Sequence, residues 1–307
     1  MTEDLRNNER IGELADSGEL CIRENVELRT LTGFRTGGNA KLALYPSTPA
    51  ACAAIMKLCG REIAVLGCGS NVLARDEDVE VPVLVTARLN RLSWDGEIAE
   101  AGAGVPLSKL AVSARDRGLA GAEFLYGIPG SVGGACAMNA GAYGHELSEI
   151  AVSFEVCDTE GNVYAVDAAD ADLSYRRSRF SDSGELVIGA RFRLTPDDRE
   201  QIGARMEDLM HRRKDKQPLE YPSAGSYFKR PEGHFAGKLI EDCGLKGRSV
   251  GGARVSEKHA GFIINSGGAT GSDVEALEEL VRAKVLAETG VTLEREVKKL
   301  GAGGFVK

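Results

Sequence analysis

The sequence lacks the motifs of the commonest nucleotide-binding and metal-binding proteins. It has neither the G-x-G-x-x-G run of a dinucleotide-binding unit nor the G-x-x-x-x-G-K-[ST] run of a phosphate-binding loop, so neither fold is predicted. Only four histidines are present, and no H-E-x-x-H run or group of four closely spaced cysteines indicates a metal site. We therefore expect no bound metal.

Signals for export and membrane insertion are also missing. Residues 1–20 mix acidic, amide and basic side chains without an apolar core, which predicts a polar N-terminal tail rather than a signal peptide. No long apolar run indicates a membrane span, so we expect no membrane insertion. The seven cysteines are scattered without a C-x-x-C pair, a pattern typical of reduced thiols in a cytoplasmic protein.

Positive charge is scarce relative to negative charge. The formal net charge is −8, so no overall basic field exists to attract nucleic acid, and we expect no nucleic-acid partner. An anionic substrate must instead be bound by a local group of Lys and Arg side chains. The basic run Arg212, Arg213, Lys214 and Lys216 is a candidate for such contacts, although most runs of this kind are solvated helix ends.

Glycine is plentiful in two clusters. The first, Gly127 to Gly144, has almost no charge, and the second, Gly67 to Leu73, follows a short apolar run that reads as a strand. Glycine lets backbone N–H groups approach a ligand closely, and successive amides at the end of a strand form an anion-binding concavity. The two clusters predict a site for a phosphate-bearing cofactor, with a structural loop as the alternative.

The order of elements along the chain predicts two domains. Helices are expected at 50–58, 107–117, 195–216, 236–243 and 272–289, and strands at 63–66, 83–86, 153–157, 163–166, 186–194 and 261–265. Pro196 is expected in the first turn of the third helix. Ser272 and Glu275 are expected to form a capping box on the last helix, with Gly290 at its C-cap.

Five further runs occur with the glycine clusters in a characteristic order: 34–38, 175–180, 223–229, 236–240 and 293–297. With them, the chain from about residue 30 to 300 resembles the UDP-N-acetylenolpyruvoylglucosamine reductases, FAD enzymes of bacterial peptidoglycan synthesis. The resemblance implies an α+β fold, with a two-lobed FAD-binding domain of the vanillyl-alcohol-oxidase type before a smaller α+β substrate-binding domain. We expect these domains at 21–197, with lobes at about 21–88 and 89–197, and at 198–307. A short connection after Ser178 favours the shorter, loop-less type II subclass.

The resemblance also implies the reaction. NADPH would reduce bound FAD, and UDP-N-acetylglucosamine enolpyruvate would then be reduced to UDP-N-acetylmuramate in the same pocket, with a monomer favoured. The residues expected to bind FAD are Gly67, Gly69, Ser70, Asn71, Val72, Leu73, Gly102, Gly127, Ile128, Pro129, Gly130, Ser131, Gly133, Gly134, Asn139, Gly141 and Tyr143. Those expected to bind substrate are Tyr175, Arg176, Lys229, Lys238, His259 and Asn265.

Three side chains are expected to act in the reaction. Ser226 would donate a proton, Glu296 would polarise the substrate carboxylate, and Arg176 would clamp that carboxylate with its planar guanidinium. We expect Glu296 to be protonated through burial or paired with a cation, with Arg176 the leading candidate. Glu294 is the alternative to Glu296, and Arg177 and Arg179 are the alternatives to Arg176. Arg295 stands where the family usually has proline.

Two other functions would fit parts of the sequence. A UDP-sugar-binding protein without activity would retain the fold but hold no flavin. A flavin oxidase on the same scaffold would explain the glycine clusters but not the segments around Ser226, Lys238 and Glu296. Ser226 could also be a turn residue, and His259 and Tyr175 could be structural.

Overall fold

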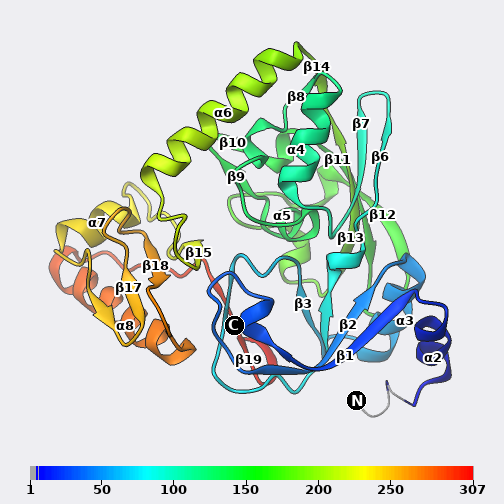
Figure 1. The fold of residues 1–307 in the computed structure, drawn as a ribbon, viewed down its shortest axis with the longest axis horizontal. Helices are drawn as coiled ribbons and strands as arrows, with labels where there is room; N and C mark the ends of the chain where they lie inside the picture. Colours follow the sequence, from blue (N-terminus) through cyan, green and yellow to red (C-terminus); the bar gives the residue numbers. More distant parts are fainter. Residues whose placement is uncertain (1–4, 6, 307) are drawn as a thin grey trace. The chain divides into compact units, whose positions relative to one another are not determined.

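The computed structural model describes residue 5 and residues 7–306, and the packing divides the chain into two compact units (Figure 1). Unit 1 consists of the residues up to Glu24, Leu42–Cys68 and Val81–Arg212. Unit 2 consists of Asn25–Lys41, Gly69–Glu80 and the residues from Arg213 onward. Two early segments are therefore compact with the C-terminal part of the chain. The boundaries expected from the sequence divide the chain into continuous domains, whereas each compact unit combines several segments. Those boundaries therefore stay a prediction.

The first sheet of unit 1 has four strands in the order β1-β2-β5-β3. Strand β5 runs parallel to both β2 and β3, as alternating helices and strands predict. Helix α3 (Pro49–Cys59) begins after Thr48, whose hydroxyl accepts a hydrogen bond from the Ala51 amide at 3.2 Å. Ile55 of this helix is packed in one core with Leu44 and Leu84. The strands are β1 (Leu20–Glu27), β2 (Asn39–Pro46), β3 (Ala64–Leu66) and β5 (Val83–Val85).

Helix α2 (Glu9–Asp16) lies within the segment expected to be a polar tail. The side chain of Asn8 caps it by accepting a hydrogen bond from the Ile11 amide at 3.2 Å. Ile11 and Leu14 are three residues apart and both are buried in the same core as helix α3. The sequence analysis missed this helix because two apolar side chains on one face give only a weak periodic signal.

The second sheet of unit 1 has five antiparallel strands in the order β12-β11-β13-β7-β6. Phe154 and Phe192, from β11 and β13, are fully buried in one core with Leu110 and Ala114 of helix α4. The expected strands and the expected second helix are confirmed, with ends that differ by one or two residues. The elements are β6 (Leu92–Asp95), β7 (Ile98–Gly102), α4 (Leu107–Asp116), α5 (Val132–Met138), β11 (Ala151–Cys157), β12 (Val163–Asp167) and β13 (Leu186–Arg193).

The predicted start of the long helix is wrong. Helix α6 (Arg199–Lys216) begins four residues later than expected, because Thr195–Pro196 forms strand β14 and pairs with β8 (Leu119–Ala120). The amide of Asp197 still donates to the Gly118 carbonyl at 2.8 Å. Proline is favoured in the first turn of a helix, but it is also tolerated at a sheet edge, and the pairing with β8 decided between the two.

Unit 2 contains a four-stranded antiparallel sheet, β15-β18-β17-β16, and a three-stranded sheet, β20-β19-β4. Helices α7 and α8 share a buried core with the first sheet, formed by side chains such as Ile240, Leu277, Val281 and Ile263. In the second sheet β19 runs parallel to β4 and antiparallel to β20. The elements are β4 (Val72–Ala74), β15 (Ser223–Ser226), α7 (Ala236–Asp242), β16 (Ser249–Val250), β17 (Ala253–Val255), β18 (Phe262–Asn265), α8 (Gly271–Thr289), β19 (Lys298–Gly301) and β20 (Gly304–Val306).

The capping box expected on the last helix is also wrong. Helix α8 begins at Gly271, and Thr270 is its N-cap: the Thr270 hydroxyl accepts from the Asp273 amide at 3.0 Å, and Asp273 accepts from the Thr270 amide at 3.0 Å. Ser272 instead donates to Asp76 at 2.6 Å. Gly290 is the C-cap in the left-handed conformation, as predicted.

The remaining elements are short. Strands β9 (Gly141–Ala142) and β10 (His145–Glu146) form a small antiparallel pair. Single 3₁₀ turns occur at Leu28–Thr30, Thr86–Arg88, Glu123–Leu125, Leu147–Glu149, Ala168–Asp170 and Arg179–Ser181. Of the helices that the structure describes, none combines the length and the apolar character needed to cross a membrane. The mixture of helices with parallel and antiparallel strands confirms the α+β class.

Candidate active site

The main glycine cluster lies around the start of helix α5 in unit 1. The amides of Val132 and Gly133 donate to the carbonyls of Val105 and Ala103 at 2.9 and 2.8 Å. Gly102 ends strand β7 directly before Ala103, and its contact with FAD stays a prediction. These bonds fix the backbone from Gly130 onward against the end of a buried strand, which gives a rigid support for a ligand.

The second glycine cluster meets the first at Ser131. A Cβ atom added to Gly67 would lie 2.5 Å from the Ser131 hydroxyl oxygen. Ser131 is 2% exposed, and its hydroxyl makes no hydrogen bond of normal geometry with any part of the chain that the structure describes. Burial raises the pKa of the neighbouring Cys68 thiol, and the Ser131 hydroxyl offsets part of that effect. Because a buried hydroxyl is costly without a partner, this group is suited to bind a ligand oxygen.

Asn139 connects the end of the main cluster to the turn that carries Tyr175 and Arg176. It is fully buried and ends helix α5 in the left-handed conformation, with φ of 42°. Its side-chain amide donates to Glu146 at 2.8 Å and to the Ser174 carbonyl at 3.2 Å. Its side-chain oxygen accepts from the Ser148 amide at 3.0 Å. The side chain of Asn139 is therefore engaged in holding these loops together, and its contact with FAD stays a prediction.

Arg176 lies in the tight turn between Ser174 and Arg177, whose backbone groups pair with each other. Its φ is 56°, an unusual value for a side chain of this size, and strain of this kind concentrates at functional sites. One guanidinium nitrogen donates to the Gly141 carbonyl at 3.3 Å, and the group lies 5.2 Å from the centre of the Tyr175 ring. Tyr175 itself is 50% exposed.

The two alternative arginines are engaged elsewhere in unit 1. Arg177 lies 3.5 Å from Asp182, with 70% of its side chain exposed. Arg179 lies 2.5 Å from Glu185, whose side chain is 7% exposed. Both make ordinary ion pairs with a carboxylate of their own loop. The role of Arg176 as the substrate clamp stays a prediction.

In unit 2 the segments of Ser226 and Glu296 lie next to each other. Ser226 ends strand β15, is exposed, and pairs with Phe262 of β18. The following residue, Tyr227, accepts a backbone hydrogen bond from the Glu296 amide at 2.9 Å. Phe228 and Arg295 form an antiparallel bridge directly beside this bond. Two residues separated by 70 positions of sequence are therefore held on adjoining segments.

The second glycine cluster continues into unit 2 and reaches the same place. The Asn71 side chain donates to the Glu296 carbonyl at 3.1 Å, and the Asn71 carbonyl accepts from the Lys298 amide at 3.0 Å. Val72 and Leu73 follow in strand β4, beside β19. The segment with Glu296 is thus fixed on one side by the residues after Ser226 and on the other by the predicted cofactor nest.

The two lysines predicted to bind substrate are both paired with carboxylates. Lys229 forms an ion pair with Glu294, and its amide donates to the Glu294 carbonyl at 2.8 Å. Glu294 is thus the ion-pair partner of Lys229, and the choice between Glu294 and Glu296 stays a prediction. Lys238, on helix α7, is exposed and lies 2.5 Å from Asp242, whose hydrogen bond and charge raise the pKa of the ammonium group. Both lysines stay predictions as substrate contacts.

His259 and Asn265 have structural contacts in unit 2. Burial lowers the pKa of His259, so the ring is neutral at pH 7, and its Nδ1 accepts from the Gly261 amide at 3.1 Å. Asn265 is 8% exposed; its side-chain oxygen accepts from the amides of Gly267 and Ala269 at 3.0 and 3.1 Å. Its amide donates to the Phe34 carbonyl at 3.0 Å. Asn265 thus shapes the loop before helix α8, and its substrate contact stays a prediction.

The basic run at the end of helix α6 shows local contacts. Arg212 lies 2.7 Å from Asp208, one turn earlier on the helix. Lys258 donates to the Lys214 carbonyl at 2.5 Å. Across residue 5 and residues 7–306, no group of three or more His, Cys, Asp or Glu side chains is placed to hold a metal ion. All seven cysteines are free thiols.

Comparison with known proteins identifies relatives of both parts of the chain. Residues 40–167 match a model described as an FAD binding domain, and residues 217–300 match the C-terminal domain of UDP-N-acetylenolpyruvoylglucosamine reductase. A reductase of that name from Clostridium novyi (strain NT) is 42% identical over 304 residues, 98% of both chains. The chain belongs to the UDP-N-acetylenolpyruvoylglucosamine reductase family.

Other members of the family give the same result. A reductase from Clostridium botulinum (strain Hall) is 45% identical over 273 residues, which are 88% of this chain and 89% of the relative. The crystal structure of the reductase from Thermus caldophilus superposes with a TM-score of 0.79 at 33% identity, and covers 91% of this chain and 99% of that one. The family resemblance, the two-domain α+β fold and the FAD enzyme class expected from the sequence are confirmed.

The residues of both units fit FAD. In unit 1 the buried Ser131 hydroxyl, which has no hydrogen-bond partner among the described residues, can donate to a phosphate. In unit 2 a Cβ atom on Gly69 would lie 2.0 Å from the Leu31 carbonyl oxygen, so only glycine allows the turn that leads into Ser70 and Asn71. Bare backbone and unpaired buried donors are the features that a pyrophosphate requires.

The sequence reasoning missed one buried group near the site. Glu278 is 2% exposed and lies on the apolar face of helix α8, between Val274 and Val281. Glu278 lies one turn after Val274 and nearly one turn before Val281, and this spacing in the sequence could have placed it on the buried face. A carboxylate at such a position must find buried partners.

Proposed function

We propose that Ser226, Glu296 and Arg176 carry out the family reaction in this chain: the FAD-dependent reduction of UDP-N-acetylglucosamine enolpyruvate to UDP-N-acetylmuramate, with NADPH as the electron donor, in peptidoglycan biosynthesis. The observation that supports this most directly is the arrangement in unit 2. There the Glu296 amide bonds to the residue after Ser226, and the Glu296 carbonyl bonds to Asn71 of the cofactor nest. Catalytic and cofactor-binding segments are thus joined by hydrogen bonds.

The chemistry that bound FAD supplies is hydride transfer from NADPH to the enolpyruvyl double bond. The protein must then deliver one proton to the carbon that bears the ether oxygen. The Ser226 hydroxyl is exposed at the end of a strand, where it can reach a substrate. A hydroxyl is a weak acid, but it can protonate a strongly basic enediolate-like carbon when it is held within about 3 Å of it.

Charge on the substrate carboxylate is controlled by the other two residues. The guanidinium of Arg176 presents parallel N–H groups that match two carboxylate oxygens, and its strained turn fixes its direction. Glu296 is half-buried, and hydrogen bonds at its amide and its carbonyl hold its backbone. The position of its Cα atom is therefore fixed. Glu296 polarises the substrate carboxylate as negative charge moves onto it.

Lys229, Lys238 and Tyr175 contribute to substrate binding. Two of them lie near a proposed catalytic residue in their own unit: Lys229 bonds to the segment of Glu296, and Tyr175 lies under Arg176. The lysines would exchange their carboxylate partners for the diphosphate of the sugar nucleotide. The enzyme acts in the cytoplasm, where UDP-sugars and NADPH are available, and it acts as a monomer. Light scattering of the purified protein tests the monomer.

Stopped-flow flavin absorbance tests the assignment of Ser226. In the Ser226→Ala variant, NADPH should reduce the flavin at the wild-type rate, because that step needs no proton from the protein. Reoxidation by the sugar nucleotide should slow by about 100-fold or more, in line with the loss of a positioned general acid. Equal slowing of both steps would contradict the role of Ser226.

The same purified wild-type protein separates this function from its rivals. Yellow protein that NADPH bleaches and the enolpyruvyl substrate recolours is the reductase. Colourless protein that still binds UDP-sugars would be a binding protein without activity. Recolouring by oxygen, after reduction by an alcohol, would indicate a flavin oxidase.

A further inference from the structure

We propose that Glu278, a buried carboxylate on helix α8, is a positioning residue that sets the placement of Ser226 and Glu296 together. The inference rests on the proposed function, because it assigns a task to the groups behind those two residues. It concerns unit 2 alone, in which all of the contacts lie. Neither the family models nor the names of the relatives assign a role to this residue.

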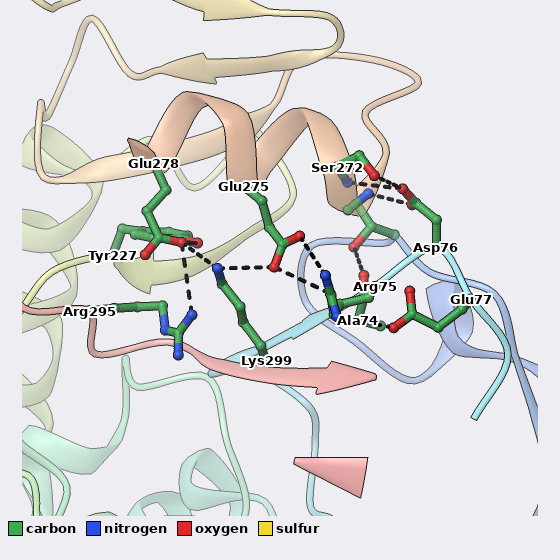
Figure 2. Close-up of polar contacts among 12 residues, drawn as sticks. Ala74, Arg75, Asp76, Glu77, Tyr227, Ser272, Glu275, Glu278, Arg295 and Lys299 are labelled. Carbon is green, nitrogen blue, oxygen red and sulfur yellow. Dashed lines mark hydrogen bonds and ion pairs between the residues drawn. The ribbon is translucent and has the colours of Figure 1, made fainter. Parts of the chain in front are cut away.

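Glu278 is the centre of a buried polar network (Figure 2). One of its carboxylate oxygens accepts from the Tyr227 hydroxyl at 2.8 Å. The same oxygen lies 3.0 Å from the Lys299 ammonium and 4.0 Å from the Arg295 guanidinium. Tyr227 is fully buried, and its burial next to the Glu278 carboxylate raises the pKa of its hydroxyl, which therefore stays protonated and donates.

The partners of Glu278 are the chain neighbours of the proposed catalytic residues. Tyr227 follows Ser226, and Arg295 precedes Glu296. Adjacent residues share a planar peptide unit, so an anchored side chain on one residue limits how the backbone of the next can turn. The bond from the Glu296 amide to the Tyr227 carbonyl, at 2.9 Å, ties the two segments into one piece. The Glu278 carboxylate thereby sets the position of both the Ser226 segment and the Glu296 segment.

The network also reaches the cofactor side of unit 2. Lys299 lies on strand β19, which pairs with β4, and β4 directly follows the nest at Gly69 to Asn71. Lys299 is 3.0 Å from Glu275 as well as from Glu278, and its side chain is 14% exposed. The charges of Lys299 and Arg295 compensate the buried carboxylate, which would otherwise be strongly unfavourable.

Glu275 provides a matched control. It lies one turn earlier on the same helix and shares Lys299 with Glu278, and it lies 3.4 Å from Arg75. Its side chain is 23% exposed. It contacts Lys299 and Arg75, which neighbour neither Ser226 nor Glu296 in the chain. Glu275→Gln thus removes the same charge from the same helix without touching the anchor at Tyr227 and Arg295.

The experiment compares Glu278→Gln, Glu275→Gln and wild-type holoenzyme by stopped-flow flavin absorbance. For Glu278→Gln we expect reduction by NADPH at the wild-type rate and reoxidation by UDP-N-acetylglucosamine enolpyruvate slowed by about 10- to 100-fold, the usual effect of misplacing reacting groups. For Glu275→Gln both steps should stay within about twofold of wild type. Thermal denaturation of both variants measures their loss of stability alongside.

Three results would overturn the inference: unchanged reoxidation in Glu278→Gln, equal slowing of both steps, or the same kinetic defect in Glu275→Gln. If Glu278→Gln does not fold, Tyr227→Phe decides, because it removes only the hydroxyl and should slow reoxidation alone by about 10-fold. Unchanged reoxidation in Tyr227→Phe would then overturn the inference. Wild-type protein that the sugar nucleotide never reoxidises would instead refute the proposed function itself.

Discussion

The substitution Gly69→Ala tests the cofactor nest most directly. Gly69 has a φ of +60°, and an added Cβ atom would lie 2.0 Å from the Leu31 carbonyl oxygen. Both obstacles are backbone features, so no side-chain rotation can relieve them. The amide of Gly33 also donates to the Gly69 carbonyl at 3.0 Å, so the loops that contain these two residues are held together.

Two contributions set the expected size of the effect. The left-handed conformation costs alanine about 1–2 kcal/mol. Relieving the overlap requires a backbone shift of about 1 Å, and overpacking of this kind costs about 1–3 kcal/mol. We therefore expect the apoprotein to lose about 2–5 kcal/mol of its free energy of unfolding. A nest amide displaced by about 1 Å loses a charge-assisted hydrogen bond of about 1.5–3 kcal/mol, so FAD should bind about 10- to 100-fold more weakly.

The control is Gly290→Ala at the C-cap of helix α8. Gly290 also has a positive φ, +72°, but nothing lies within 4 Å of an added Cβ atom. This variant should lose only the conformational part, about 1–2 kcal/mol, and should bind FAD normally. Guanidinium denaturation of the apoproteins and flavin fluorescence titration measure the two quantities. Equal stability of the two variants, with unchanged FAD affinity in Gly69→Ala, would refute the reasoning about the nest.

Three further predictions concern the substrate clamp, the core and the pH dependence of stability. Arg176→Lys should raise KM for the enolpyruvyl substrate about 10-fold or more and leave flavin reduction by NADPH unchanged, because lysine cannot bind a carboxylate with two parallel N–H groups. Steady-state and stopped-flow kinetics measure the two effects, and an unchanged KM would contradict the prediction. Leu277→Ala, at a fully buried position, should cost about 2–5 kcal/mol in chemical denaturation, whereas Leu286→Ala, 48% exposed on the same helix, should cost less than about 0.5 kcal/mol. Burial acts to raise the pKa of Asp76, but hydrogen bonds from Ser272 and Gly271 outweigh it, so the folded-state pKa lies below the unfolded value. The difference in unfolding free energy between wild type and Asp76→Asn should therefore be largest at pH 7. It should shrink as the pH falls below about 4 and through the folded pKa. A difference that stays constant from pH 7 to pH 3 would count against this prediction.

Local signals in the sequence were enough for most of the individual elements. Helices α3, α4, α7 and α8 and the strands around Phe154, Phe192 and Ile263 were predicted within a few residues, because their apolar spacing, prolines and glycines act locally. Errors arose where a distant segment competed. Thr195–Pro196 pairs with β8 instead of starting a helix, and Ser272 binds Asp76 instead of capping α8. In each case a partner far away in the sequence provided a better hydrogen bond than the local motif.

The site shows the same division. The amino-acid sequence by itself determined the family, the cofactor and the residue types of the reaction, because glycine clusters and reactive side chains keep their chemistry wherever the chain goes. Only the tertiary structure decided that the Glu296 segment adjoins Ser226 and Asn71, that Arg177 and Arg179 pair with carboxylates of their own loop, and that Glu278 is buried behind the site. The contacts of Glu296 and the burial of Glu278 join residues tens to hundreds of positions apart, and such contacts are fixed by the packing of whole elements rather than by any short stretch of sequence.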